Sequence, residues 1–136
     1  MTRTYVLDAN AVLDFVEGGP GSRRVEQMLA AALQHNIPLL ISVVNWGEVF
    51  YHLWQERGEE VARKTIANLS RVAIQTVPVD LDQSLQAGEI KARHKIPYVD
   101  CLAAALAQKR RAVLVTSDRD FEKLGRRIQV SWITRP

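Results

Sequence analysis

Apolar residues along the chain alternate between short continuous runs and longer stretches with helical spacing. The short runs, which suit β-strands, cover residues 4–7, 39–41, 73–79, 113–115 and 128–133. Apolar residues recur every three or four positions, as in amphipathic helices, over 9–16, 22–33, 43–57, 61–69, 81–94 and 98–108. Strands that alternate with helices predict an α/β fold, with a mainly parallel central sheet and helices on both faces. We expect one domain over residues 1–136.

Polar residues and glycines mark where several of these helices should begin and end. Ser22 is expected to cap the helix that follows it, and Asp80 with Gln83 resembles a capping pair. Gly58 is expected to end the helix over 43–57. The stretch 98–108 is apolar nearly all round, which predicts a helix at the centre of the molecule.

The composition is that of a globular domain, with 47% hydrophobic and 24% charged residues among 136. No apolar run is long enough to cross a bilayer, and the apolar stretch before Asp8 is too short for a signal peptide. The single cysteine, Cys101, stands in an apolar stretch and is expected to be a buried thiol. The three histidines lack the close pairing of a zinc site. We therefore expect a cytoplasmic protein that has no membrane partner.

Basic residues are clustered, although the net charge is only +3 and the pI is about 9.3. Clusters stand at Arg23-Arg24, 91–95, Lys109-Arg110-Arg111 and Arg126-Arg127. Two interpretations stay open, because such clusters suit a phosphate backbone but lysines and arginines also end helices and face water. Charge alone therefore does not establish a nucleic-acid partner.

Four of the fifteen acidic residues stand in unusual sequence contexts. Asp8, Glu48 and Asp100 interrupt apolar stretches, and Asp118 directly follows an apolar strand. An ionised carboxylate in apolar surroundings is costly unless it is paired, hydrogen-bonded or bound to a metal. Most other acids occupy polar stretches and are expected on solvated faces, namely Glu17, Glu26, Glu56, Glu59, Glu60, Glu89 and Glu122.

The predicted fold brings these four acids to one edge of the sheet. Asp8 and Asp118 follow strands, and the other two acids stand in the first two turns of helices that should start from the same edge. Several carboxylates close together repel, and the usual remedy is a hard divalent cation such as Mg²⁺ or Mn²⁺. Such a site can activate a water and stabilise charge on a scissile phosphate, so phosphodiester hydrolysis is the expected chemistry.

Each acid except Glu48 also has a simpler structural interpretation. Asp8 could cap the helix that starts at Ala9, and Asp118 could cap a short helix around Phe121. Asp100 could interact with the positive end of its helix. Capping does not explain a glutamate inside an apolar helix, so the joint pattern favours a shared site.

Four motifs in order make the chain resemble the PIN domain, and a free-standing chain of this length resembles the toxin subunit of VapBC-type toxin–antitoxin pairs. The resemblance runs from about Tyr5 to Ile133. The motifs are Tyr5-Val-Leu-Asp8-Ala-Asn10, Val44-Asn-Trp-Gly-Glu48-Val, Ile96-Pro-Tyr-Val-Asp100-Cys-Leu-Ala-Ala-Ala and Leu114-Val-Thr116-Ser-Asp118-Arg-Asp120-Phe.

This resemblance implies a metal-dependent endoribonuclease that uses Mg²⁺ or Mn²⁺. Its metal ligands and catalytic residues would be Asp8, Glu48, Asp100 and Asp118. Asn10, where the family more often has a hydroxyl, and Thr116 would support the ligands or the attacking water. Asp120 could join the site, although a surface position is favoured.

The resemblance also implies partners: an RNA substrate, a small antitoxin protein and a second copy of the chain in a homodimer. Residues that could bind the RNA are Lys109, Arg110, Arg111, Arg126 and Arg127. The alternative is a non-catalytic PIN-like module that binds RNA or protein, but a binding scaffold has no need to gather unpaired negative charge.

Overall fold

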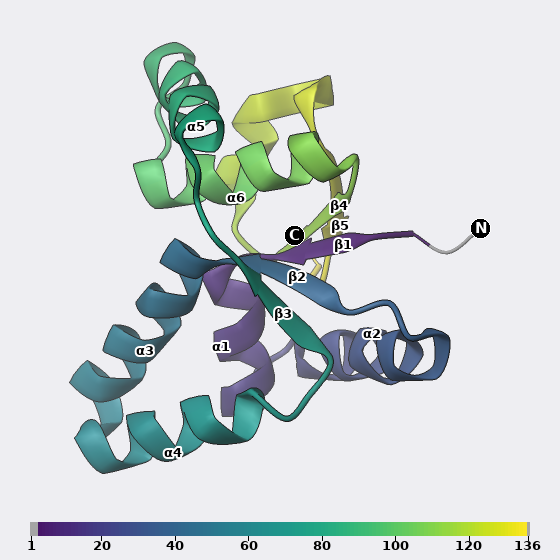
Figure 1. Ribbon diagram of the computed structural model, residues 1–136, viewed down its shortest axis with the longest axis vertical. Coiled ribbons are helices and arrows are strands. Elements are labelled where there is room, and N and C mark those ends of the chain that lie inside the picture. Colours follow the sequence, from purple (N-terminus) through teal and green to yellow (C-terminus); the bar gives the residue numbers. More distant parts are fainter. Residues whose placement is uncertain (1–2, 136) are drawn as a thin grey trace.

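The computed structural model describes residues 3–135, which are built around a sheet of five parallel strands (Figure 1). The strands lie in the order β3-β2-β1-β4-β5. Their bounds are β1 Tyr5–Leu7, β2 Leu39–Ser42, β3 Ile74–Val77, β4 Val113–Thr116 and β5 Gln129–Trp132. The predicted α/β fold with a mainly parallel sheet is confirmed, since every strand pair is parallel.

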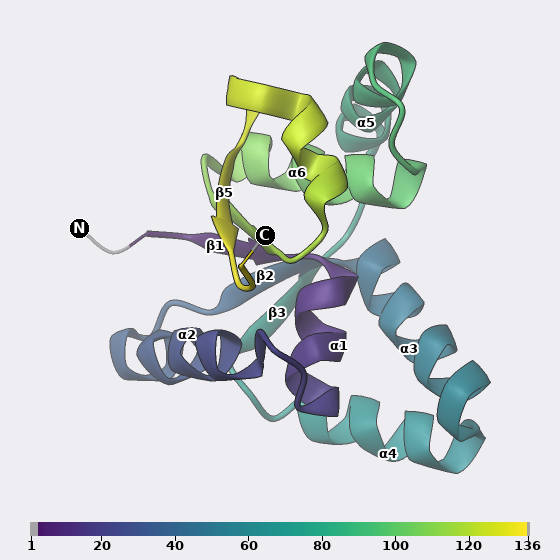
Figure 2. The same ribbon diagram turned by 180° about the vertical axis from the view of Figure 1, so that it is seen from behind.

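Helices cover both faces of the sheet, as the sequence predicts. On one face lie α1 Ala9–Glu17, α2 Ser22–His35, α3 Val43–Arg57 and α4 Glu59–Leu69. On the other face lie α5 Leu81–Arg93, α6 Tyr98–Arg110 and the 3-10 helix η1 Arg119–Arg127. Figures 1 and 2 show these two layers from opposite sides, with α5 and α6 on one side of the strands and α1 to α4 on the other.

Alternating side chains of the central strands feed two separate cores. Val6, Leu40 and Leu114 contribute to the core beneath α5 and α6, whereas their neighbours Leu7 and Ile41 contribute to the core beneath α1 to α4. Every residue of α6 from 101 to 107 is buried, which confirms both the central helix and the buried thiol of Cys101. Burial raises the pKa of that thiol.

The observed elements differ from the predicted ones mainly at their ends. The third strand is shorter than the predicted 73–79 and stops before Pro78, which has no N–H for the sheet. Ser22 does not cap α2, because it is the first helical residue and Gly21 holds the capping position. Ser22 instead donates its hydroxyl hydrogen to the Phe15 carbonyl at 3.4 Å. The predicted caps Asp80 and Gly58 are both observed.

The strand order places a change of direction between β1 and β4. After β1 the chain adds β2 and β3 on one side, and it then returns to add β4 and β5 on the other side. In sheets of this type a crevice opens at that point, beyond the carboxyl ends of the strands. We call this side of the molecule the carboxyl edge; Leu7, Ser42 and Thr116 are the last residues of their strands there.

None of the helices within residues 3–135 combines the length and the apolar character needed to span a bilayer.

Candidate active site

Asp8 is buried at the carboxyl edge, between β1 and the helix that it caps. Its Oδ1 atom accepts a hydrogen bond from the Ala11 backbone N–H at 2.8 Å, and its Oδ2 atom accepts one from the Thr116 hydroxyl. Burial raises the pKa of Asp8 to about 7, and the nearby Asp100 and Asp118 charges act in the same direction. The two hydrogen bonds oppose this rise because they favour the charged form.

Thr116 connects Asp8 to the acid that follows β4. While its hydroxyl donates to Asp8, the same oxygen accepts a hydrogen bond from the Asp118 backbone N–H at 2.9 Å. Asp118 in turn caps η1, because its Oδ1 atom accepts a hydrogen bond from the Asp120 backbone N–H at 2.9 Å. One buried hydroxyl therefore orients acids from two neighbouring strands.

The other two predicted acids come from the beginnings of two helices that pack against each other. Asp100 lies in the first turn of α6 and Glu48 in the second turn of α3, and both are partly buried. Burial raises the pKa of Asp100 to about 7, with further contributions from Asp118, Glu48 and Asp120. Burial also raises the pKa of Glu48, the nearby Asn45 and His52 side chains oppose this rise, and Asp118 adds to it.

The four acids therefore lie within electrostatic reach of one another, although they come from four separate parts of the chain. The pKa of Asp100 responds to Asp118 and Glu48, and that of Asp8 responds to Asp100 and Asp118. Within residues 3–135, no lysine, arginine or histidine forms an ion pair with any of the four. No three of them have oxygen atoms all within 4.8 Å of one another in that part of the chain.

This donor set fits a hard divalent cation. The four side chains offer only carboxylate oxygens, which are the ligands that Mg²⁺ and Mn²⁺ prefer. Their negative charge is not offset by a neighbouring ion pair in the described chain, so a bound cation would relieve a real repulsion. Asp120 lies at the margin of this group: it raises the pKa of Asp100 but also forms an ion pair with Lys123 at 3.5 Å.

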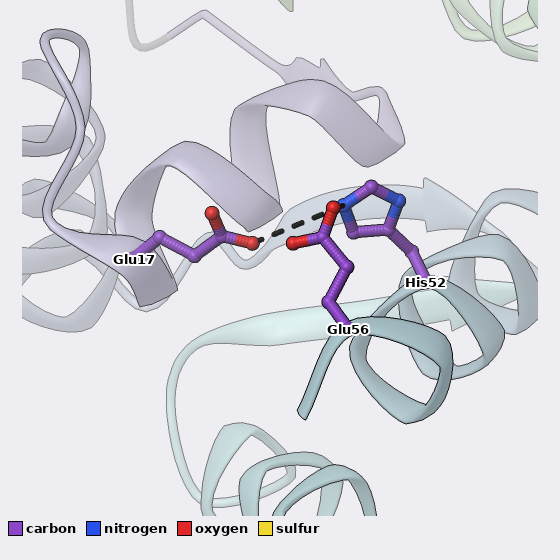
Figure 3. A group of neighbouring side chains, drawn as sticks. All are labelled: Glu17, His52 and Glu56. Carbon is purple, nitrogen blue, oxygen red and sulfur yellow. Dashed lines mark ion pairs between the residues drawn. The ribbon is translucent and has the colours of Figure 1, made fainter. Parts of the chain in front are cut away.

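A second group of potential ligands is not predicted by the sequence. His52 lies on α3 between Glu56 of the same helix and Glu17 at the end of α1, and Figure 3 shows the three side chains converging. The His52 Nε2 atom is 3.2 Å from Glu56 Oε1 and 4.0 Å from Glu17 Oε1. One donor atom from each lies within 4.8 Å of the others, so the group has suitable donors for a divalent ion. The sequence predicts Glu17 and Glu56 on solvated faces, and only the packing of α1 beside α3 brings them together.

Of the remaining predicted residues, Asn10 lies near the four acids and the basic residues lie far from them. Asn10 is exposed in the first turn of α1, two residues after Asp8. The basic residues stand at the opposite edge of the sheet, because α6 ends at Arg110, just before β4 begins, and η1 ends at Arg127, just before β5 begins. The structure therefore does not bring Lys109, Arg110, Arg111, Arg126 or Arg127 beside the acids.

Two of these basic side chains already have acidic partners. Lys109 forms an ion pair with Asp80 at 2.9 Å, and Arg127 forms one with Glu89 at 2.8 Å. Arg127 and Arg111 also line an open cleft of about 750 Å³ between α5, the end of α6 and the start of β5.

Sequence reasoning missed one buried polar residue near the acids. Asn45, in the first turn of α3, is completely buried and donates a hydrogen bond to the backbone of α6. Its polarity is visible in the sequence, since Asn45 interrupts the apolar stretch Val43-Val44 before Trp46.

Comparison with known families agrees with this arrangement. The family model of the PIN domain matches residues 5–127, which include all four acids. The chain belongs to the PIN domain family. No curated protein matches it in sequence.

Several solved structures share this PIN fold at low sequence identity. DNA-bound VapBC from Salmonella typhimurium has a TM-score of 0.74 at 20% identity, covering 97% of this chain and 99% of that chain. VapBC-1 from nontypeable Haemophilus influenzae has a TM-score of 0.73 at 21% identity, with coverage of 97% and 99%. VapC20 from Mycobacterium tuberculosis, described as a sarcin–ricin loop cleaving toxin, has a TM-score of 0.68 at 21% identity, with coverage of 90% and 95%. At this identity the likeness shows the fold.

Proposed function

We propose that this PIN domain is a divalent-metal-dependent endoribonuclease and the toxin of a toxin–antitoxin pair. Mg²⁺ or Mn²⁺ would be held by Asp8, Glu48, Asp100 and Asp118, which would also be the catalytic residues. The observation that carries the proposal is the convergence of these acids at the carboxyl edge without ion-pair partners among residues 3–135. VapC20, which has the same fold and is described as a sarcin–ricin loop cleaving toxin, supports RNA as the substrate class.

The chain's own residues would orient the reaction. Asp8 is held in one orientation by the Ala11 N–H and the Thr116 hydroxyl, so its carboxylate would not have to reorganise during the reaction. Asn10 is exposed beside it and can contact substrate or the attacking water through its amide. When bound, a divalent cation would neutralise the carboxylates and stabilise the charge that develops on the scissile phosphate.

The test is cleavage of total RNA by the purified protein in Mg²⁺ and in EDTA. We expect cleavage in Mg²⁺ alone, and we expect Asp118→Asn to lose most of it because every ligand shapes the same site. Asp82→Asn, which removes an exposed acid from the first turn of α5, is the matched control and should keep full activity. Cleavage that continues in EDTA would contradict the metal mechanism. Metal binding without any cleavage would favour a non-catalytic binding module.

The proposal includes the expected partners. Two structures with the same fold are described as VapBC, the type of toxin–antitoxin pair that the motifs of this chain resemble, which supports a small antitoxin protein as partner here. We also propose a homodimer in the cytoplasm. Light scattering of the purified chain measures its mass directly; a mass equal to that of one 15.3 kDa chain at all concentrations would contradict the homodimer.

A further inference from the structure

Asn45 occupies a place in α3 where an apolar residue would ordinarily stand. It lies in the first turn, one turn before Glu48, and its side chain is completely buried. Among the described residues it is one of few buried polar side chains; Asp8 and Thr116, which belong to the proposed active site, are two of the others.

The amide of Asn45 joins the beginnings of two helices. Its Nδ2 atom donates a hydrogen bond to the Val99 carbonyl at 3.3 Å, across 54 positions of sequence. Val99 directly precedes Asp100 in the first turn of α6. The same amide lies near Glu48, one turn further along α3, and lowers the pKa of that carboxyl, which favours the charged form of the glutamate. Asn45 therefore lies one turn from one of the four acids and is bonded to the residue next to another.

Stability does not account for an asparagine at this position. Its Oδ1 atom is buried and has no hydrogen-bond partner within residues 3–135. An unsatisfied buried polar atom costs about 1–3 kcal/mol, whereas an apolar side chain of similar volume would avoid that cost. Packing of α3 therefore does not explain why an asparagine stands here. The neighbouring acids do, because the asparagine amide lies beside them.

We infer that Asn45 is a positioning residue, which holds the Glu48 carboxylate and the first turn of α6 so that Glu48 and Asp100 face the same point. This inference rests on the proposed function, since it concerns the geometry of the same acids. Residues that orient metal ligands typically change metal affinity by about 10- to 100-fold when they are replaced.

The test compares Asn45→Leu with the wild-type protein in two measurements that need no RNA. Calorimetry should show a Mn²⁺ affinity at least about 10-fold weaker in the variant. Urea unfolding in EDTA should show equal or higher stability, because the unpartnered oxygen is gone. Where RNA is also used, kcat at saturating Mn²⁺ should fall as well. If the leucine side chain does not fit the buried position and the variant fails to fold, Asn45→Ala removes the same amide with a smaller side chain and is tested in the same way.

Gln83→Leu is the matched control, because Gln83 is also a buried amide in the first turn of a helix. Asp80, which caps this helix, pairs with Lys109 at the far end of α6 from Asp100. We expect wild-type Mn²⁺ affinity in this control. Wild-type affinity and kcat in Asn45→Leu would overturn the inference, and so would an equal loss of affinity in Gln83→Leu. If the wild-type protein binds Mn²⁺ but cleaves no RNA, the proposed function is wrong. The Mn²⁺ affinity of Asn45→Leu would then still decide whether Asn45 positions the acids.

Discussion

Thr116 donates its hydroxyl hydrogen to the Asp8 carboxylate, although the two residues are 108 positions apart in the chain. The bond joins the carboxyl ends of β1 and β4, the two strands between which the sheet changes direction. Because the same hydroxyl also accepts the Asp118 N–H, the geometry of two acids depends on one buried side chain. This dependence can be tested without any assay of activity.

Thr116→Val should destabilise the protein more than the loss of one surface hydroxyl would. The change keeps the shape but removes the hydrogen-bond partner of the Asp118 N–H and of the Asp8 Oδ2 atom, while Asp8 Oδ1 keeps its bond from the Ala11 N–H. We expect the free energy of unfolding, measured by urea in EDTA at pH 7, to fall by about 1–3 kcal/mol. Thr76→Val is the control, since Thr76 is exposed on the edge strand β3 and its replacement should change stability by less than about 0.5 kcal/mol. Equal effects of the two changes would contradict the role of the hydroxyl.

Asp100→Asn should stabilise the metal-free protein at pH 7. The pKa of Asp100 is raised from 3.8 to about 7 by burial and by neighbouring acids. At this group the folded state therefore binds more protons than the unfolded state, so the contribution of Asp100 to stability is fullest below about pH 4 and declines as the pH rises towards 7. The asparagine carries no charge to bury or repel, and we expect a gain of about 1 kcal/mol at pH 7 that shrinks at pH 5.

The control for Asp100→Asn is Asp82→Asn. Asp82 also lies in the first turn of a helix but is exposed, so losing its charge should cost a few tenths of a kcal/mol through the helix dipole. Chemical denaturation of both variants in EDTA at pH 5 and pH 7 gives the comparison. A less stable Asp100→Asn variant at pH 7 would mean that the acid serves its helix rather than a crowded cluster.

Metal affinity should increase with pH across neutrality. Asp8 and Asp100 both have a pKa of about 7 in the metal-free protein, so protons compete with a cation for these carboxylates. We expect Mn²⁺ affinity to rise between pH 6 and pH 8 and protons to be released on binding. Calorimetry in two buffers that differ in ionisation enthalpy measures this release directly. Affinity that is constant over this range would exclude protonated acids from the binding site.

Replacing Arg110 and Arg126 with glutamine should weaken the binding of long RNA but not of short RNA. Both are exposed, form no ion pair within the described chain, and stand at the edge of the sheet opposite the acids. Arg110 is ten residues beyond Asp100 on α6, about 15 Å along the helix. Only an RNA long enough to extend along α6 would contact both the acids and these two arginines.

The measurement for these arginines is the dependence of RNA affinity on salt. Each phosphate contact that is lost should flatten the slope for long RNA, because fewer counterions are released. Arg23→Gln is a suitable control, since Arg23 is exposed at the beginning of α2 on the other face of the sheet. An unchanged slope would place Arg110 and Arg126 away from the RNA.

Local pattern by itself determined the fold class and where the four acids stand in it. The apolar runs around Val6 and Leu114 predict buried strands because a parallel sheet is covered on both faces. The carboxyl ends of parallel strands share one edge, so strand direction alone is enough to place Asp8 and Asp118 together. These predictions depend only on the spacing of apolar residues and on strand direction. They do not require knowledge of which helices pack against each other.

Tertiary packing decided what lies around those acids. The bond from Asn45 to Val99 exists because α3 and α6 begin side by side, and the group of Glu17, His52 and Glu56 exists because α1 ends beside α3. The sequence carries no signal for either pairing, because each depends on how two separate helices pack against each other. The positions of the basic clusters could not be predicted either. The sequence shows how many basic residues each cluster has, but the direction of α6 in the fold places Arg110 at the edge of the sheet opposite Asp100.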